Sequence, residues 1–424
     1  MHKIFAISMS LCLSLVLLLS SCGQQEAPPT SSAAENPQSQ EAASAAEEIK
    51  PVKIAVAFAL SGTNAEAGKM GVDAVTLAVG KINESGGIKS LGGAPVEMVI
   101  ADITSDPGQS KQVVERLLAD EEISALVGCG SSALMLPVLP VLEKARIPAV
   151  TNCNAPGITN QGYKYVFSIT HPGAAAGSNV VRCIDWLNNE MGYSYKKVAI
   201  VYENSAFGIS SAEGSREDAE KYGLEIVFDE SFAPGITDAS AIVTAMKNSG
   251  AEVFIPATYA SESKLFIETM RTMDYHPLII GPVAWPSLAE GLGESVNGIL
   301  STGNWNPYTR AVQDNPDYAA LVDEYFDAYG YFMTEVSGAN YQATWVIKEA
   351  IELCASRDGA VIRDTISGST FENTIMTESS VKFDETGQNI NAKAVLAQWQ
   401  NGIPYAIYPV EYSVAGFIDP KEIN

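Results

Sequence analysis

Apolar and polar positions follow two patterns along most of the chain. Segment 53–60 is apolar almost throughout, which is typical of a strand that is covered on both faces. The next segment places Val75, Val79 and Ile82 at the i, i+4 and i+7 spacing of one helix face. The glycines at 86–87 can supply the left-handed residue that ends such a helix. This pattern predicts a strand and a helix that open a parallel α/β sheet.

The same two patterns recur further along the chain. Strands are predicted at residues 96–101, 125–129, 148–151, 197–202, 224–229, 252–257 and 278–281. Helices are predicted around residues 107–118, 207–222, 238–248, 261–273, 318–329 and 341–355. The first of these helices opens on Asp106-Pro107, with the aspartate as N-cap and the proline at the first helical position. Residues 382–417 indicate short strands and turns, with a hairpin-like turn at 385–388.

This order of elements predicts an α/β fold with two doubly wound parallel-sheet lobes. The strand–helix units fall into two sets, and each set can enclose a hydrophobic core of its own. Open parallel sheets bind small molecules outside the carboxyl ends of their strands. A ligand site is therefore expected among the loops that follow the strands.

The first 50 residues indicate export and attachment to a membrane. An apolar run at 4–19 is too short to span a membrane comfortably and is typical of a secretory signal. The letters LSSC at 19–22 resemble a bacterial lipobox, which predicts a lipoprotein signal peptide over 1–21 and a lipid on Cys22. The alternative is an ordinary signal peptide with an incidental cysteine. Residues 22–50 are rich in Ala, Ser, Gln, Glu and Pro, which predicts a disordered tether.

Composition narrows the class of protein. The chain has 50 acidic and 26 basic residues, a net charge of −24. This argues against nucleic acid and anionic lipid as partners, because both are bound by clustered Lys and Arg. Of the six cysteines, two fall in the signal peptide and at the lipid site. The others show no C-x-x-C pair and no metal-ligand spacing, so no metal is expected, and their pairing stays open: Cys129, Cys153, Cys183 and Cys354.

Several short motifs add a family resemblance. They are SGTNAEAG at 61–68, DITSDPGQS at 102–110, GCGSS at 128–132, TNCNAPGIT at 151–159, YENSAFG at 202–208 and SGANYQATWVIKEAI at 337–351. In their order and spacing the chain resembles, over nearly all of residues 52–424, the branched-chain amino-acid-binding (Leu/Ile/Val-binding) family of extracellular solute-binding proteins. The resemblance implies the type I periplasmic-binding-protein fold, a two-lobed clamp that closes on a small solute. It also implies partners, namely the permease and ATPase subunits of an ABC importer.

The resemblance further implies how the chain is shared between the lobes. In the family the chain crosses between lobes more than once. Lobe 1 is then expected to comprise 52–172 and 303–385, and lobe 2 to comprise 173–302 and 386–424. The crossover segments would act as the hinge.

The turn at 128–132 is the first candidate for ligand contact. It follows a predicted strand and opens a helix, where free backbone N–H groups and the helix dipole favour an anion such as a carboxylate. By the resemblance, Ser132 aligns with the serine that bonds the ligand carboxylate, with Gly130 and Ser131 beside it. The alternative is a serine that caps its own helix. Prolines at 137 and 140 fall within this helix, which is therefore expected to start late or to bend.

Asn152, Cys153 and Asn154 occupy the next turn, where the family supplies backbone groups and one hydroxyl. Asn154 is expected to replace that hydroxyl with an amide. The alternative is that asparagine in a turn bonds only its own backbone.

Aromatic residues are expected on the second lobe. Phe207 and Tyr259 match positions that the family uses to line its cleft, and Trp285 and Trp305 fall on loops after later strands. Such flat apolar walls suit a ligand with an apolar or aromatic body.

Two positions depart from the family pattern. Amino-acid-binding members carry an acidic residue after the strand that ends near Gly281, and residues 283–285 here read Val-Ala-Trp. Because a buried ammonium without a partner is costly, either another acid such as Glu203 or Glu262 serves, or the ligand has no ammonium. Ala67 also stands where the family often has an aromatic residue, which predicts a larger pocket on that side.

A secreted hydrolase with Ser131 or Ser132 as nucleophile is the rival class. A serine triad needs a histidine, and beyond the signal peptide the sequence has only His171 and His276, each before a proline in a predicted turn. A G-x-S-x-G elbow, an H-E-x-x-H motif and a phosphate-binding loop are also missing from the sequence. No enzymatic activity and no cofactor are therefore expected.

The sequence thus predicts a monomeric, extracytoplasmic solute receptor of an ABC importer, held at the cell membrane only by its lipid. Candidate ligands are branched or aromatic amino acids, related keto or aryl acids, and small amides. The alternative is a ligand-binding sensor subunit that presents its bound form to a separate membrane receptor. The identity of the ligand and the type of cell envelope stay open.

Overall fold

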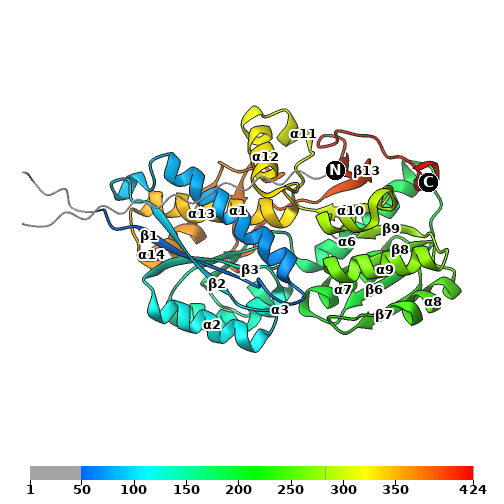
Figure 1. The fold of residues 1–424 in the computed structure, drawn as a ribbon, viewed down its shortest axis with the longest axis horizontal. Coiled ribbons are helices and arrows are strands. Elements are labelled where there is room, and N and C mark those ends of the chain that lie inside the picture. Colours follow the sequence, from blue (N-terminus) through cyan, green and yellow to red (C-terminus); the bar gives the residue numbers. More distant parts are fainter. Residues whose placement is uncertain (1–48, 282, 424) are drawn as a thin grey trace, which may run out of the picture. The chain divides into compact units, whose positions relative to one another are not determined.

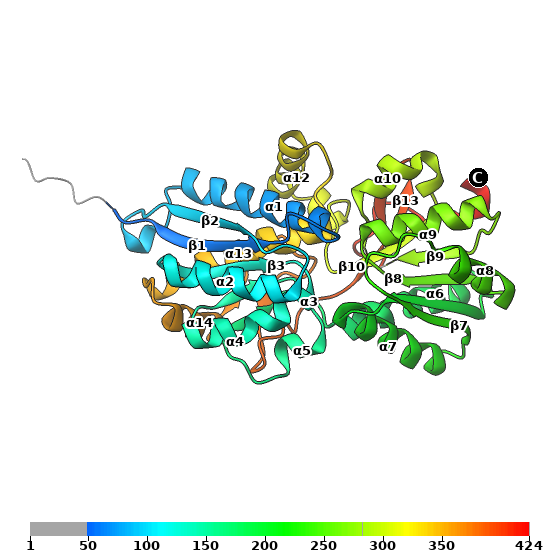
Figure 2. The same cartoon turned by 60° about the horizontal axis from the view of Figure 1, so that its bottom comes forward.

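The computed structural model describes residues 49–281 and 283–423, and Figures 1 and 2 show their fold. The predicted signal peptide, the lipid on Cys22 and nearly all of the predicted tether at 22–50 lie outside these residues. The described residues form two large sheets, each covered by helices, and one small antiparallel ribbon. The ribbon consists of β11 (Thr370–Phe371) and β12 (Val381–Lys382).

The first sheet has five parallel strands in the order β2–β1–β3–β4–β5. They are β1 (Val52–Phe58), β2 (Val96–Asp102), β3 (Ile123–Cys129), β4 (Ala149–Thr151) and β5 (Val166–Ser168). β1 and β3 are buried almost throughout, as the apolar runs predict. β5 was not predicted from the sequence.

Helices cover both faces of the first sheet (Figures 1 and 2). They are α1 (Ala65–Glu84), α2 (Pro107–Asp120), α3 (Ser132–Met135), α4 (Leu139–Ala145), α5 (Pro156–Thr159), α12 (Pro316–Tyr329), α13 (Glu335–Cys354) and α14 (Gly359–Gly368). Alternate residues of β1 face opposite cores. Ile54 and Val56 join the cluster of α1 and α13, whereas Ala55 and Ala57 join that of α2, α3 and α4.

Several local predictions on this side of the molecule are confirmed. The Asp106 carboxylate accepts a hydrogen bond from the Gln109 backbone N–H at 2.8 Å, so it caps α2 as its sequence suggests. Gly86 and Gly87 follow α1 with φ of 98° and 68°. The helix after β3 is bent, as predicted, because a 3₁₀ turn at Leu136–Val138 separates α3 from α4.

The second sheet has seven strands in the order β14–β13–β10–β9–β8–β6–β7. They are β6 (Lys197–Glu203), β7 (Glu225–Phe232), β8 (Val253–Ala257), β9 (Leu278–Gly281), β10 (Leu300–Gly303), β13 (Val395–Gln400) and β14 (Ile403–Tyr408). β6 to β10 are parallel, but β13 and β14 are antiparallel. The sheet is therefore mixed. Asn401 and Gly402 join β13 to β14 with φ of 54° and 78°, and a two-residue turn can connect only antiparallel strands.

Helices also cover the second sheet on both faces. They are α6 (Gly173–Asn189), α7 (Ala206–Lys221), α8 (Ser240–Ser249), α9 (Ala260–Thr272) and α10 (Pro286–Leu292), with α15 (Pro420–Ile423) outside them. The short α11 (Arg310–Gln313) contacts α12, and its Val312 packs in the core of α1 and α13. Val198 and Ile200 of β6 face the core of α6 and α7. Ala199 and Val201 face that of α8 and α9.

We propose the lobe boundaries predicted above with one change. Gln388 Nε2 donates to the Thr170 carbonyl at 2.5 Å, and Asn389 Nδ2 donates to the Ile169 carbonyl at 2.8 Å. Because both residues are still bonded to the segment that follows β5, the last crossover is placed after Asn389 and not after Glu385.

Candidate ligand-binding site

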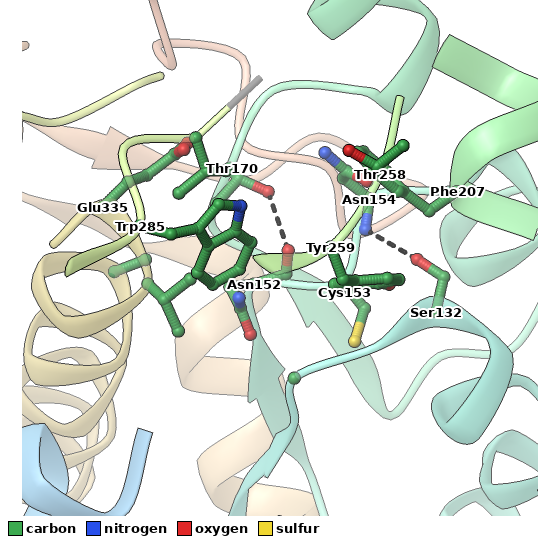
Figure 3. A pocket seen from close by; sticks show the side chains of 14 residues that line it. Ser132, Asn152, Cys153, Asn154, Thr170, Phe207, Thr258, Tyr259, Trp285 and Glu335 are labelled. Carbon is green, nitrogen blue, oxygen red and sulfur yellow. Dashed lines mark hydrogen bonds between the residues drawn. The ribbon is translucent and has the colours of Figure 1, made fainter. Parts of the chain in front are cut away.

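A pocket lies where the carboxyl ends of strands from both sheets meet (Figure 3). Its empty volume is about 550 Å³, part of it continuous with solvent. Its lining residues are Gly130, Ser132, Asn152, Cys153, Asn154, Thr170, Phe207, Thr258, Tyr259, Val283, Trp285, Glu335, Val336 and Ala339. The structure thus brings together all of the predicted ligand residues except Ser131. Their contact with a ligand stays a prediction.

Ser132 does not cap its own helix. Its side-chain oxygen, in a residue that is 2% exposed, accepts the backbone N–H groups of Asn154 at 3.2 Å and Ala155 at 3.1 Å. A hydroxyl has two acceptor lone pairs and one donor. Both acceptor positions of Ser132 are therefore used by the next turn, and its proton is left to donate into the pocket. α3 has only four residues, so this hydroxyl and the free N–H groups of the first turn matter more here than the helix dipole.

The turn after β4 presents polar atoms that still lack a partner. The Asn152 carbonyl accepts from the Thr170 hydroxyl at 3.2 Å, whereas the buried Asn152 Oδ1 has no hydrogen-bond partner among the described residues. Cys153 is fully buried, and its desolvation raises the pKa of the thiol to about 11. It therefore lines the pocket as a neutral thiol. A free amide oxygen beside it is an acceptor for a ligand N–H or O–H.

Three aromatic residues form a row along the second lobe (Figure 3). The ring centroids of Phe207 and Tyr259 are 5.6 Å apart, and those of Tyr259 and Trp285 are 6.4 Å apart. Trp285 Nε1 is buried and has no hydrogen-bond partner among the described residues. The row offers apolar faces and one unused N–H donor, which suits a flat or branched apolar body with a polar edge.

Ser131 has a different position from its neighbour. Its hydroxyl oxygen accepts from the Tyr259 hydroxyl at 3.2 Å, so it joins the two lobes beside the pocket. Trp305, the fourth aromatic candidate, lies in the core of the first lobe, where its Nε1 donates to the Ile375 carbonyl at 2.7 Å. Ala67 packs in a cluster with Phe332 and Val336 and is not among the lining residues.

The acid that faces the pocket is Glu335, the first residue of α13. Its Oε1 accepts the Asn304 backbone N–H at 3.0 Å, and burial raises the pKa of its carboxyl to about 7. Glu203 and Glu262, the two acids suggested by the sequence, do not line the pocket. Glu262 instead accepts from the Gly235 N–H at 3.2 Å and the Ser261 hydroxyl at 2.7 Å.

Sequence reasoning missed the remaining lining residues for identifiable reasons. Thr170 follows the unpredicted strand β5, and Thr258 directly precedes the predicted Tyr259. Glu335 lies six residues before the predicted start of its helix at residue 341, on the first turn of α13. The Thr334 hydroxyl oxygen accepts the Ser337 backbone N–H at 3.2 Å. Thr334 in the sequence TEVS at 334–337 is therefore an N-cap residue, and it could have predicted that the helix begins at residue 335 and not at 341.

The buried Glu203 makes stability depend on pH. Its side chain is 5% exposed, and desolvation raises the pKa of its carboxyl from 4.5 to about 7. The folded state then binds the extra proton, so the free energy of unfolding should fall as pH rises from about 4.5 to about 7. In Glu203→Gln, the decrease in the free energy of unfolding between these pH values should be smaller by about 1–3 kcal/mol. Urea unfolding across that pH range measures it, and an unchanged pH profile would contradict the assignment.

Neither histidine is placed to serve a nucleophile. His171 is buried with Nδ1 3.3 Å from the Pro172 carbonyl, and burial lowers its pKa. His276 Nδ1 lies 2.7 Å from Arg271 Nη1 at the surface. Within residues 49–281 and 283–423, no group of three or more His, Cys, Asp or Glu side chains could hold a metal ion.

The comparison with known protein families decides the class. Residues 51–403 match the family model described as periplasmic binding protein. The chain belongs to the periplasmic binding protein family. This family binds solutes outside the cytoplasm and is not enzymatic. Membership therefore rules out the alternative of a secreted hydrolase. In the part of the chain that the structure describes, no helix is both long and apolar enough to cross a membrane.

Relatives and solved structures agree with this family. The "Leu/Ile/Val-binding protein homolog 7" of Brucella abortus is 27% identical over 380 residues, which cover 87% of this chain and 94% of the relative. The branched-chain amino acid transporter substrate binding protein LivJ from Streptococcus pneumoniae, in complex with isoleucine, has a TM-score of 0.74 and 23% identity, covering 85% of this chain and 100% of that chain. An ABC transporter solute binding protein from R. palustris, in complex with benzoate, has a TM-score of 0.74 and 16% identity. The match covers 86% of this chain and 98% of that chain. At these identities the two structures support the fold, with its two lobes.

Proposed function

We propose that this periplasmic binding protein is the solute receptor of an ABC importer and binds an amino acid or a related carboxylate or amide between its lobes. The observation that carries the proposal is the pocket itself. On one lobe the pocket is lined by Ser132, whose hydroxyl proton is free to donate, and on the other lobe by a row of aromatic rings. The relatives named above for leucine, isoleucine and valine, and the structural neighbours with isoleucine or benzoate, support a small carboxylate.

The ligand carboxylate is assigned to the Ser132 end of the pocket. A carboxylate accepts hydrogen bonds only, and the Ser132 hydroxyl has only its proton left to give. The ligand body then lies against Phe207, Tyr259 and Trp285, where burial of apolar area contributes about 25 cal/mol per Å².

Ligand binding is proposed to hold the lobes closed. Hydrogen bonds already join them beside the pocket, among them those from the Tyr259 hydroxyl to Ser131 Oγ at 3.2 Å and from the Ser287 hydroxyl to Glu66 Oε2 at 2.8 Å. A ligand that contacts both lobes prefers the closed form, and only that difference in affinity can shift the population. A shift from mostly open to mostly closed requires roughly 5 kcal/mol of preference.

The proposal includes export and anchoring. A signal peptide over 1–21 and a lipid on Cys22, followed by a tether over 22–50, would hold a monomeric receptor close to the membrane that contains its permease. Acyl chains contribute about 0.8 kcal/mol per buried CH₂, so more than one chain is needed for a stable anchor.

A ligand panel tests the function. We expect at least one of leucine, isoleucine, phenylalanine, their keto acids, benzoate or a small amide to raise the melting temperature of the protein. The same compound should make the protein more compact in small-angle scattering. Scattering that is unchanged by every compound that raises the melting temperature would contradict a clamp.

A further inference from the structure

The strongest unexplained feature of the pocket is an acid at the end opposite the proposed carboxylate position. We infer that the ligand carries a cationic amino group remote from its carboxylate, and that Glu335 holds this group. The inference rests on the proposed function, because it assumes that a carboxylate ligand occupies the cleft. It narrows the ligand to ω-amino acids and aminoalkyl aryl acids.

The geometry separates the two ends. Figure 3 shows Ser132 and Glu335 on opposite sides of the pocket, with Trp285 and Tyr259 between them. In an α-amino acid the ammonium and the carboxylate share one carbon, so a carboxylate at Ser132 leaves the ammonium far from Glu335. A ligand with an apolar spacer can place one charged group at each end and cover the aromatic row with its middle.

A second small pocket adjoins the first at Glu335. Its empty volume is about 300 Å³, and its lining includes Thr302, Gly303, Asn306 and Glu335. Gly303 leaves room for the acid, because a Cβ there would be 2.8 Å from Glu335 Oε2. An ammonium group donates hydrogen bonds, and the Glu335 carboxylate, whose Oε1 already accepts the Asn304 N–H, still has acceptor positions on Oε2 for it.

Charge also favours a cation at this end. Among the described residues that line the two pockets, Glu335 is the only Asp, Glu, Lys, Arg or His. The other titratable side chains there are Cys153 and Tyr259, and burial raises the pKa of each, so both are neutral near pH 7. A largely desolvated carboxylate without a cationic neighbour is poorly stabilised. A ligand ammonium would supply the missing partner, whereas a second ligand carboxylate would be repelled.

The titration of Glu335 supports the same placement. Burial raises the pKa of its carboxyl from 4.5 to about 7, and the Asn304 N–H on its Oε1 opposes that rise. A cation binds the ionised form, so its affinity should increase as pH rises through about 7. A ligand that has a methyl group in the same place should bind equally well, or less well, as pH rises.

Paired ligands and paired variants test the inference. Isothermal titration calorimetry would compare para-(aminomethyl)benzoate with para-methylbenzoate, and δ-aminovalerate with valerate, at about pH 6 and about pH 8. We expect the wild-type protein to prefer the amine of at least one pair at the higher pH. Glu335→Gln should weaken that amine about 10- to 100-fold and leave its neutral counterpart within about 2-fold.

Glu203→Gln is the matched control, because it makes the same change at an acid that also has a raised carboxyl pKa but does not line either pocket. It should keep the preference for the amine. An equal effect of Glu335→Gln on both members of a pair, or no preference for an amine in the wild-type protein, would overturn the inference. If a carboxylate without an amine then still binds in a way that depends on Ser132, the proposed function is supported and only the ammonium site at Glu335 is rejected. If no carboxylate binds to the wild-type protein, both the proposed function and the ammonium site are rejected.

Discussion

Ser132→Ala should weaken the binding of a carboxylate ligand by about 1–3 kcal/mol, roughly 5- to 150-fold in the dissociation constant. The hydroxyl uses both acceptor positions on the backbone N–H groups of Asn154 and Ala155, so its proton is directed to another acceptor. In the proposed complex that acceptor is a ligand oxygen, which would be desolvated on closure. Removing the donor leaves this oxygen unpaired, and calorimetric titration with leucine, benzoate and para-(aminomethyl)benzoate measures the loss.

The same substitution should also lower the stability of the free protein. The N–H groups of Asn154 and Ala155 lose their shared acceptor, and an unsatisfied buried donor costs about 1–3 kcal/mol. Ser131→Ala is the matched control, since Ser131 is equally buried but bonds Tyr259 and does not line the pocket. A Ser131→Ala protein that loses as much affinity as Ser132→Ala would contradict the placement of the carboxylate at Ser132.

Gly68→Ala should destabilise the fold by about 3 kcal/mol or more. A Cβ at Gly68 would lie 1.7 Å from the Ala59 carbonyl oxygen, and backbone at the end of β1 cannot move aside as a flexible side chain can. The close approach of α1 to the residue after β1 therefore depends on the missing side chain. Urea unfolding of the variant measures the loss.

Gly80→Ala is the matched control on the same helix. A Cβ at Gly80 meets no heavy atom within 4 Å, so alanine should stabilise α1 by about 0.5–1 kcal/mol through its higher helix propensity. Opposite signs from one substitution at two positions of α1 would establish close approach as the cause. Equal effects at Gly68 and Gly80 would refute it.

The second lobe repeats this arrangement. A Cβ at Gly208, near the start of α7, would lie 2.0 Å from the Glu203 carbonyl oxygen at the end of β6. Gly68 and Gly208 are the last residues of the motifs SGTNAEAG and YENSAFG. Both motifs therefore encode the same tight strand-to-helix turn, which brings the first helical residues of each lobe close to the cleft. That explains why Phe207, next to Gly208, lines the pocket.

Much of the fold was predictable because its signals are local. Apolar runs marked the buried strands, and Asp106-Pro107 marked the start of α2. The strands β5 and β10 and the helix α6 were not predicted. Hydrogen bonds to neighbouring strands hold β5 and β10 in their sheets. The antiparallel β13 and β14 likewise depend on which edge of the second sheet is left open to the returning chain.

By itself, the sequence determined the class of fold, the two strand–helix sets and the turns that end beside the pocket, because each depends on residues close together in the chain. Only the tertiary structure decided which acid enters the pocket. Glu335 lies more than 70 residues from Tyr259 in the sequence, and packing of α13 against the first sheet places both in one lining. The structure also separated Ser131 from Ser132, since the neighbours of a side chain are set by what packs around it and not by its position in the chain.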